Sequence, residues 1–265
     1  MARPKRRLGQ HFLQDPAILR RIAAAAGAGP DDTVLEIGPG PGGLTAALAA
    51  TGARVVAIEK DTELIAPLAT RIPSLILAEG DALELDWHAL AGSERFIIAG
   101  NIPYNITSPL IDKALEPPMP ERVVFLVQKE VAERVAAAPG QGSYGALSVG
   151  VQAVARVERL FSVPAGAFTP PPKVDSAVLR LTPLAVPLIV PADRGAFRAM
   201  VVGLFGLRRK QMLRALRELT GWPAERCAPA LEAAGIAATA RAETLPPMTF
   251  VRLFRVLVDA GWGGG

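Results

Sequence analysis

Residues 101–105 form the segment of this chain whose residue types are best suited to chemistry. They read Asn-Ile-Pro-Tyr-Asn. The Asn101 side-chain oxygen and the Ile102 backbone carbonyl are two acceptors, and Pro103 restricts Ile102 to extended conformations, which holds that carbonyl in one direction. Tyr104 adds a flat ring on which a flipped base can stack. Taken alone, this segment is also compatible with an ordinary turn.

Two acceptors and a ring suit methyl transfer to an aromatic amine such as adenine N6. That nitrogen is a poor nucleophile, because its lone pair is delocalised into the ring. Acceptors aimed at both amino hydrogens would draw it toward tetrahedral geometry and free the lone pair. A cationic sulfonium is already electrophilic, so catalysis would need positioning and electrostatics but no metal and no side-chain nucleophile. We therefore predict Asn101 and Ile102 as the acceptors.

Glycines and acids earlier in the chain predict a site for a nucleoside cofactor. Glu36 precedes the run Gly38-Pro-Gly40-Pro-Gly-Gly43, which leaves a predicted strand and opens a helix. Glycine there lets the backbone approach a ligand and supplies helix-start amides. Glu59 lies 21 residues past Gly38 at the end of the next strand, where it can accept hydrogen bonds from both ribose hydroxyls.

The glycine run is compatible with two cofactors, S-adenosylmethionine and NAD. Its spacing also satisfies the G-x-G-x-x-G pattern of an NAD-dependent oxidoreductase. However, the prolines at 39 and 41 stiffen the turn and remove amide donors that would hold a pyrophosphate. Asp81 ends a third strand and can accept the adenine amino group of the cofactor, or cap the next turn. We predict S-adenosylmethionine, since the NAD alternative leaves Asn-Ile-Pro-Tyr unexplained.

The elements that must position these residues alternate between strands and helices. This alternation predicts βαβ units and an α/β, Rossmann-like methyltransferase fold with a mainly parallel sheet. Ligands of such sheets bind beyond the carboxyl ends of the strands, and Gly38, Glu59, Asp81 and Asn101 all fall at predicted strand ends. The predicted strands are 33–37, 54–59, 75–79, 96–99, 123–128 and 177–181, and the helices are 16–26, 44–51 and 62–71.

A change of composition after residue 183 predicts two domains. We assign residues 1–183 to a catalytic domain that binds S-adenosylmethionine, opening with a basic arm and a helix in residues 1–29. Residues 184–265 are expected to form a small helical domain that recognises RNA, with helices at 194–220 and 224–258.

Composition narrows the setting of the protein. The 265 residues carry a net charge of +4, with 50% hydrophobic residues, one cysteine and two histidines. These counts exclude a disulfide within the chain, and no cluster has metal-ligand spacing. The apolar runs are too short or too broken to span a bilayer, and no apolar stretch follows the basic N-terminus. We expect a cytoplasmic protein without metal or membrane association.

Positive charge is concentrated in the predicted helical domain. Seven Lys or Arg and no acid lie between Arg194 and Arg217. Lys210, Arg214 and Arg217 fall on one helical face, which is either an ordinary solvated face or a phosphate-binding one. Together with the basic arm at residues 3–7, this stripe favours contact with nucleic acid.

Several stretches resemble the ribosomal RNA adenine dimethyltransferases, and most closely the members that act on the small subunit. The resemblance covers nearly the whole chain. It rests on Leu8-Gly-Gln-His-Phe-Leu13, Glu36-Ile-Gly-Pro-Gly40, Asn101-Ile-Pro-Tyr-Asn105 and Phe168-Thr-Pro-Pro-Pro-Lys-Val-Asp-Ser176, with further similarity at Gln128-Lys-Glu130, Tyr144-Gly145, Leu147-Ser148 and Arg241-Ala-Glu-Thr-Leu245.

The resemblance implies transfer of two methyl groups from S-adenosylmethionine to each of two adjacent adenosines. Their place would be a terminal hairpin loop of small-subunit (16S) rRNA, within a pre-30S particle, and the enzyme would be a monomer with a role in small-subunit biogenesis. Residues implied to contact the cofactor are His11, Leu13, Gly38, Gly40, Glu59, Asp81 and Asn101, and Tyr104 and Phe168 are implied to stack on the base. Position 11 is often Asn in this family.

Two further alternatives remain open from the sequence. One is the large-subunit rRNA adenine methyltransferase of the macrolide-resistance type, which performs the same chemistry on another RNA. The stretch 168–176 and the helical tail argue against it. The other is a ribosome-assembly factor whose main role is binding, which the intact segment 101–104 disfavours without excluding a dual role.

Overall fold

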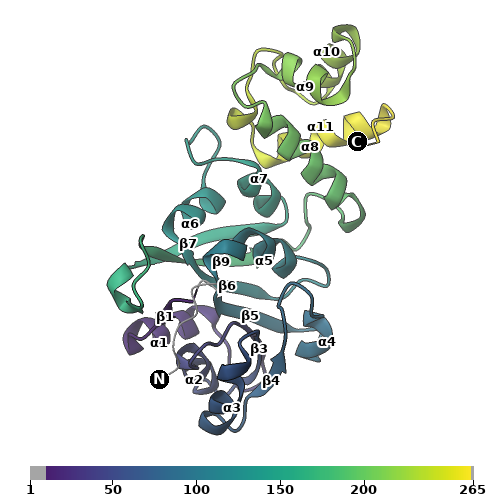
Figure 1. Cartoon of the computed structure of the whole chain (residues 1–265). Helices are drawn as coiled ribbons and strands as arrows, with labels where there is room; N and C mark the ends of the chain where they lie inside the picture. The colour runs from purple at the N-terminus through teal and green to yellow at the C-terminus, as the bar shows by residue number, and fades with distance from the viewer. Residues whose placement is uncertain (1–9, 264–265) are drawn as a thin grey trace. The chain divides into compact units, whose positions relative to one another are not determined.

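The computed structural model describes residues 10–263, so the predicted arm at residues 3–7 lies outside the described range. The chain forms two compact units, Met1–Ala132 with Val157–Pro183, and Glu133–Arg156 with Leu184–Gly265 (Figure 1). One change of unit falls after residue 183, and residues 133–156 group with the second unit rather than with the rest of residues 1–183. Hydrogen bonds from the Tyr144 hydroxyl to Leu245 O and from Gly140 N to Glu243 O hold this insertion there.

A seven-stranded sheet forms the centre of the first unit, in the order β4-β3-β2-β5-β6-β9-β7. The strand pairs between β4 and β6 are all parallel, and β9 is antiparallel to β6. The predicted α/β fold with a mainly parallel sheet is confirmed. The strands are β2 (Thr33–Ile37), β3 (Arg54–Glu59), β4 (Ile76–Glu79), β5 (Phe96–Asn101), β6 (Arg122–Gln128), β7 (Ala155–Val163) and β9 (Ser176–Pro183).

The helices of the sheet region follow from local signals. The Asp15 side chain caps α1 by accepting from Ala17 N and Ile18 N, and Pro16 occupies the first helical position, as predicted. Right-handed crossovers place α2 and α3 on one face of the sheet and α4 and α5 on the other. These helices are α1 (Pro16–Ala26), α2 (Gly43–Ala49), α3 (Thr62–Arg71), α4 (Trp87–Ala91), α5 (Thr107–Ala114) and α6 (Lys129–Ala136).

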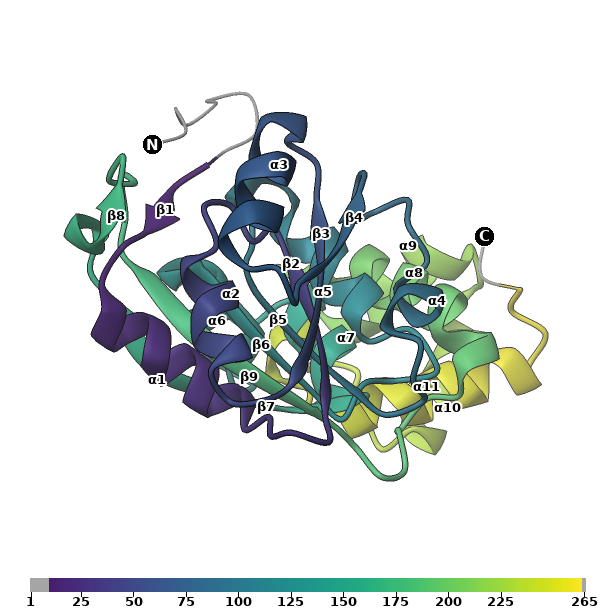
Figure 2. The same ribbon diagram turned by 90° about the horizontal axis from the view of Figure 1, so that it is seen from below.

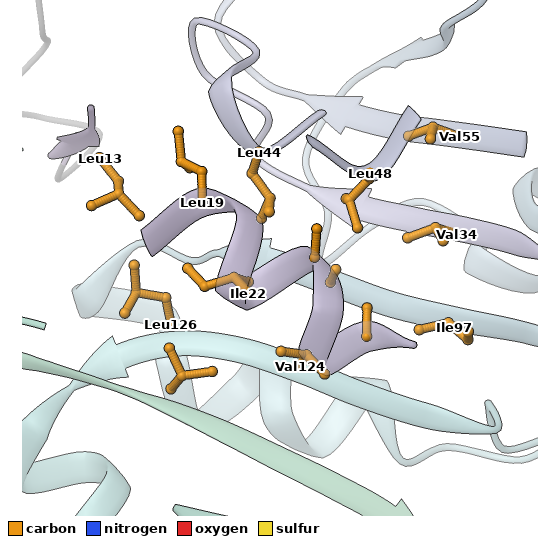
Figure 3. Close-up of a cluster of buried hydrophobic side chains, with 14 of the residues drawn as sticks. Leu13, Leu19, Ile22, Val34, Leu44, Leu48, Val55, Ile97, Val124 and Leu126 are labelled. Carbon is orange, nitrogen blue, oxygen red and sulfur yellow. The ribbon is translucent and has the colours of Figure 1, made fainter. Parts of the chain in front are cut away.

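Packing of α1 and α2 on the sheet builds the main core of the first unit (Figure 3). Ile22 of α1 and Leu48 of α2 are wholly buried in this cluster with Val34 and Val124 of the sheet. Burial of each such side chain contributes about 1.5–3 kcal/mol. This core anchors the strands whose carboxyl ends carry the predicted site residues.

The sheet has its topological switch point between β2 and β5. Chain connections lead from β2 through β3 to β4 on one side, and from β5 to β6 on the other. The strands approach closely here: a Cβ added at Gly100 would lie 2.6 Å from Ile37 O of the neighbouring strand. A ligand crevice is expected at this point, outside the carboxyl ends of both strands.

A separate two-stranded sheet joins two distant parts of the first unit. β1 (Phe12–Leu13) pairs antiparallel with β8 (Phe168–Thr169), with Leu13 opposite Phe168, and Figure 2 shows the two strands side by side. The sequence analysis did not predict this pairing. It brings residues 10–13 beside the loop that precedes β9.

The second unit has shorter helices than predicted. The helix expected at 194–220 is two helices, α8 (Arg194–Gly206) and α9 (Met212–Thr220), and the one expected at 224–258 is α10 (Ala224–Ala233) and α11 (Pro247–Asp259). Gly235, with φ of 71°, terminates α10, and Pro246 and Pro247 delay the start of α11. α7 (Ala146–Gln152) completes the unit. Strand β7 was also missed, because charged residues interrupt its sequence.

Because β2 and β5 lie so close together, one methyl group added between them is expected to lower the stability of the protein. Gly100→Ala is expected to destabilise the protein by about 1–3 kcal/mol, because its Cβ meets a backbone oxygen rather than a movable side chain. Gly150→Ala, in α7 with no heavy atom within 4 Å of the added Cβ, is the matched control and should be neutral or slightly stabilising. Denaturant unfolding checks both, and equal stability of the two variants would contradict the prediction.

Candidate active site

A cavity at the carboxyl ends of β2, β3 and β5 gathers the residues predicted for the site. Its lining includes ten of them: His11, Leu13, Gly38, Gly40, Glu59, Asp81, Asn101, Ile102, Pro103 and Tyr104. Glu36 and Lys60 line it too. Phe168 is the one predicted residue that does not.

The glycine turn after β2 holds the Glu59 carboxylate. Gly38 and Gly40 adopt the left-handed φ values of 67° and 55° that favour glycine. Gly40 N donates to Glu59 Oε2 over 3.1 Å, and Asp61 N donates to Oε1 over 2.7 Å. Burial raises the pKa of Glu59, and these two amide donors oppose that rise. The carboxylate is thus fixed in place, with lone pairs left to accept ribose hydroxyls.

Glu36 is a buried acid, and one of its carboxylate oxygens makes no hydrogen bond within the described part of the chain. The residue is 1% exposed, and the oxygen without a hydrogen-bond partner within residues 10–263 is Oε2. Burial, followed by repulsion from Glu59, raises the pKa of Glu36 to about 8. A buried carboxylate is stabilised when a cation reaches it. An acid of this kind in the cavity wall therefore fits a ligand that carries a positive charge.

Asp81 is held ionised by a lysine next to Glu59. Lys60 Nζ donates to Asp81 Oδ2 over 2.5 Å, and this contact is the main reason that the pKa of Asp81 is lowered. Leu83 N donates to Oδ1 over 2.9 Å, so Asp81 also caps the following turn. An ionised carboxylate only accepts hydrogen bonds, which suits recognition of an amino group such as that of adenine.

Asn101 presents its oxygen to the cavity because its nitrogen is engaged. Asn101 Nδ2 donates to the backbone oxygen of His11 over 2.8 Å. This bond orients the amide and leaves Oδ1 as the acceptor that the predicted chemistry requires. The partner lies directly before β1, 90 positions earlier in the chain, so the small sheet helps to bring these two parts of the candidate site together.

The rings of His11 and Tyr104 lie against each other. Their centroids are 5.5 Å apart with an interplanar angle of 20°. His11 Nδ1 lies 2.8 Å from Pro170 O, and since a carbonyl oxygen only accepts, this nitrogen carries the proton. The Tyr104 hydroxyl is hydrogen bonded to Ser176 Oγ over 2.7 Å. Tyr104 is therefore contacted both at its hydroxyl and on its ring.

Phe168 occupies a different environment from the one expected of a base-stacking aromatic. Its side chain is 3% exposed and packs in the main core with Leu13 and Val163. The pairing of β8 with β1 buries the ring. In this structure Phe168 supports the small sheet and has no open face toward the cavity.

Four contact residues escaped the sequence analysis. Gln10 Nε2 donates to Asp61 Oδ2 over 3.0 Å and ties the N-terminal segment to the start of α3. Lys60, Pro170 and Ser176 make the contacts described above. Gln10, Pro170 and Ser176 lie within stretches that carried the family resemblance, and Lys60 directly follows the predicted Glu59. Their roles depend on contacts between segments distant in sequence.

The basic residues of the second unit are partly neutralised. Arg208 pairs with Glu243 at 2.7 Å, and Glu218 accepts from both Lys210 and Arg214. The stretch 194–217 contains no acid, yet folding and the next helical turn bring these two acids to it. Arg209 and Arg217 are exposed and lie outside these pairs, so they are the better candidates for phosphate contact.

Within residues 10–263, no three His, Cys, Asp or Glu side chains are grouped to hold a metal ion. Over the same range, no helix has the length and apolar character to cross a membrane.

A mainly parallel sheet with acids and glycines at its switch point, next to an oriented asparagine, defines a class of methyltransferase that binds a nucleoside cofactor. The particular family follows from the sequence. The chain belongs to the ribosomal RNA adenine dimethylase family, which it matches over residues 1–259. Its cofactor is S-adenosylmethionine.

Relatives share most of their length with this chain. A protein of Phenylobacterium zucineum is 45% identical over 94% of this chain and 86% of its own length. One of Pseudomonas aeruginosa is 43% identical, with coverages of 97% and 96%. Both are named ribosomal RNA small subunit methyltransferase A.

Solved structures show the same fold. A dimethyladenosine transferase from Plasmodium falciparum has a TM-score of 0.85 at 28% identity, covering 96% of this chain and all of that one. The 23S rRNA methyltransferase ErmE has a TM-score of 0.71 at 32% identity, with coverages of 93% and 99%. The NAD-dependent oxidoreductase alternative is not supported by these similarities.

The buried Glu36 predicts a pH-dependent stability and affinity. Its folded pKa of about 8 exceeds the ordinary 4.5, so the folded protein holds a proton that the unfolded chain releases between these values. The stability that Glu36 contributes is therefore fully present below 4.5 and is lost as the pH rises through about 8. A cationic ligand favours the ionised form, so its affinity should rise with pH up to about 8, with release of a proton.

Glu36→Gln is expected to remove both pH dependences and to weaken binding of S-adenosylmethionine. Isothermal titration calorimetry in buffers of different ionisation enthalpy measures the proton release, and unfolding at several pH values measures the stability. Binding by the unsubstituted protein without proton release below the pKa of Glu36 would contradict this interpretation.

Proposed function

We propose that this protein dimethylates the N6 amino groups of two adjacent adenosines in the terminal hairpin loop of 16S rRNA. One observation carries the proposal: a single cavity joins three acids suited to a nucleoside cofactor with an oriented Asn101 acceptor and the Tyr104 ring. The names of the relatives support the small subunit as the source of the RNA.

Each of three acids of the cavity would contact a different part of the cofactor. Glu59 would accept hydrogen bonds from the ribose hydroxyls, Asp81 would accept one from the adenine amino group, and Glu36 would face the positive charge of the methionine end. S-adenosylmethionine, when bound, supplies the methyl group as a cationic sulfonium. Two observations fit this group. Glu36 Oε2 has no hydrogen-bond partner among the described residues, and a Cβ added at Gly38 would have only Asn101 O within 4 Å, at 3.9 Å, so the turn leaves room there for close approach.

Asn101 and Ile102 activate the target amine. The Asn101 side-chain oxygen and the Ile102 carbonyl accept hydrogen bonds from the two amino hydrogens, and these bonds localise the lone pair on nitrogen. Tyr104 stacks against the base and holds it in reach, which lowers the barrier through positioning. A role of Phe168 as a second stacking ring would need its side chain to leave the core, so Tyr104 is the primary platform in this proposal.

Exposed arginines of the second unit bind the RNA backbone in this proposal. Arg209 and Arg217 offer positive charge that is not engaged in the ion pairs around Glu218 and Glu243. Phosphate contacts of this kind position an RNA without reading its sequence.

The biological setting belongs to the same proposal. A substrate within a pre-30S particle agrees with the small-subunit names of the relatives, and we propose action as a monomer in the cytoplasm. The large-subunit alternative shares the fold of ErmE, but the small-subunit relatives support the proposed substrate over it. An assembly factor without catalysis would have no need for the oriented acceptor at Asn101.

Asn101→Ala is expected to lower methyl transfer to undermodified small ribosomal subunits by about 10²–10³-fold, because it removes an acceptor at the reacting amine. Transfer from labelled S-adenosylmethionine, with digestion of the RNA to nucleosides, measures dimethyladenosine. Binding of the product S-adenosylhomocysteine serves as the control for an intact cofactor site. Label in large-subunit RNA instead would favour the rival substrate, and tight subunit binding without label would favour the assembly factor.

Neutralising Arg209 and Arg217 to Gln is expected to weaken RNA binding and to reduce the slope of log affinity against log salt by about one for each phosphate that the protein no longer neutralises. Cofactor affinity should stay unchanged. Arg95→Gln is the control, since Arg95 is exposed just before the amino-terminal end of β5, and the cavity lies at the carboxyl end of that strand. Titration of labelled hairpin RNA at several salt concentrations measures both quantities, and an unaltered slope in the double variant would rule out these phosphate contacts.

A further inference from the structure

We propose that Ser176 is a positioning residue for methyl transfer, which sets the orientation of the Tyr104 ring before the target adenine arrives. This inference rests on the proposed function, in which Tyr104 is the stacking platform. Ser176 does not line the cavity. It would act only through Tyr104, and its role is therefore distinct from that of the acceptors at 101 and 102.

The hydrogen bond between Ser176 and Tyr104 joins a hydroxyl held in the central sheet to one carried by a connecting segment. Ser176 is wholly buried at the first position of β9, where it lies opposite Gln128 in the pairing with β6. Tyr104 belongs to a short 3-10 turn, Tyr104–Ile106, and its side chain is half-buried. The 2.7 Å hydrogen bond between the hydroxyls thus ties a ring in a connecting segment to the central sheet.

A second contact limits the tilt of the same ring. His11 stacks on Tyr104 at 20° between planes, and the imidazole is itself held by Pro170 O. One end and one face of Tyr104 are therefore occupied by protein groups. A base that enters the cavity meets a ring whose rotation is already restricted, so less ordering is needed when it stacks.

The competing explanation is that the bond only satisfies a buried serine. A buried hydroxyl without a partner destabilises a protein wherever it lies, so loss of stability alone does not distinguish the two. Ser148 provides the matched control, because it is also wholly buried and its hydroxyl donates to Arg134 O in the second unit. A positioning role predicts a change in transfer rate for Ser176 but none for Ser148.

The experiment compares Ser176→Ala, Tyr104→Phe and the double variant in transfer to undermodified small subunits. Each single change is expected to lower kcat/KM by about three- to tenfold, the effect of one hydrogen bond, and the double variant should be no worse than the more affected single variant. Affinity for S-adenosylhomocysteine should stay unchanged. Ser148→Ala should lower the midpoint of thermal unfolding without changing kcat/KM.

A spectroscopic measurement reports on the ring without requiring activity. The chain has two tyrosines, Tyr104 and Tyr144, so protein labelled with fluorotyrosine gives two ¹⁹F signals, and Tyr104→Phe assigns them. Ser176→Ala is expected to shift or broaden the Tyr104 signal and to leave the Tyr144 signal in place. The Ser148→Ala variant should not affect the Tyr104 signal.

The outcomes separate failure of the two proposals. If Tyr104→Ala leaves transfer unchanged, the stacking function is wrong and the role of Ser176 falls with it. If Tyr104→Ala abolishes transfer while Ser176→Ala alters neither the rate nor the Tyr104 signal, only the role of Ser176 is overturned. Additive losses in the double variant would also overturn it, because they would show that Ser176 acts independently of Tyr104.

Discussion

The parallel pairing of β2 with β5 is the constraint on which the whole site depends. Backbones approach so closely there that a Cβ at Gly100 would meet Ile37 O at 2.6 Å. The pairing sets Glu36 opposite Ala99, and it therefore places the glycine turn after β2 beside Asn101 at the end of β5. In the proposed mechanism, the residues that would hold the methyl donor and those that would hold its acceptor lie at adjacent strand ends, and their separation is set by the sheet rather than by flexible loops.

Electrostatics then distinguish the two halves of the cavity. In the proposed arrangement, the cofactor half contains Glu36, Glu59 and Asp81, each in a different state: Glu36 has a strongly raised pKa, Glu59 is held by amide donors, and Asp81 is kept ionised mainly by Lys60. The target half contains an amide and aromatic rings. A cation is favoured on one side and a neutral base on the other, which fits a reaction between a sulfonium and an amine.

The target half is assembled from three distant parts of the chain. His11 supplies the backbone oxygen that orients Asn101 and the ring that contacts Tyr104, while Ser176 binds the Tyr104 hydroxyl. The small β1–β8 sheet makes this possible, because it fixes residues 10–13 beside the loop that leads into β9. Burial of Phe168 beneath this sheet gives that aromatic residue a supporting place in the core.

The sequence by itself determined the α/β sheet, the bounds of its predicted strands to within about two residues, and eight of the residues that line the cavity, while His11 and Leu13 were expected from the family resemblance alone. These features are local, since apolar runs, capping residues and strand-end motifs are read over a few positions. The breaks in the C-terminal helices and the Arg214–Glu218 pair follow local signals that the prediction did not use. Only the tertiary structure decided the β1–β8 pairing, the ion pair of Arg208 with Glu243, and the burial of Phe168. Each of these depends on which distant segments meet, and residue types along a single chain do not encode that choice locally.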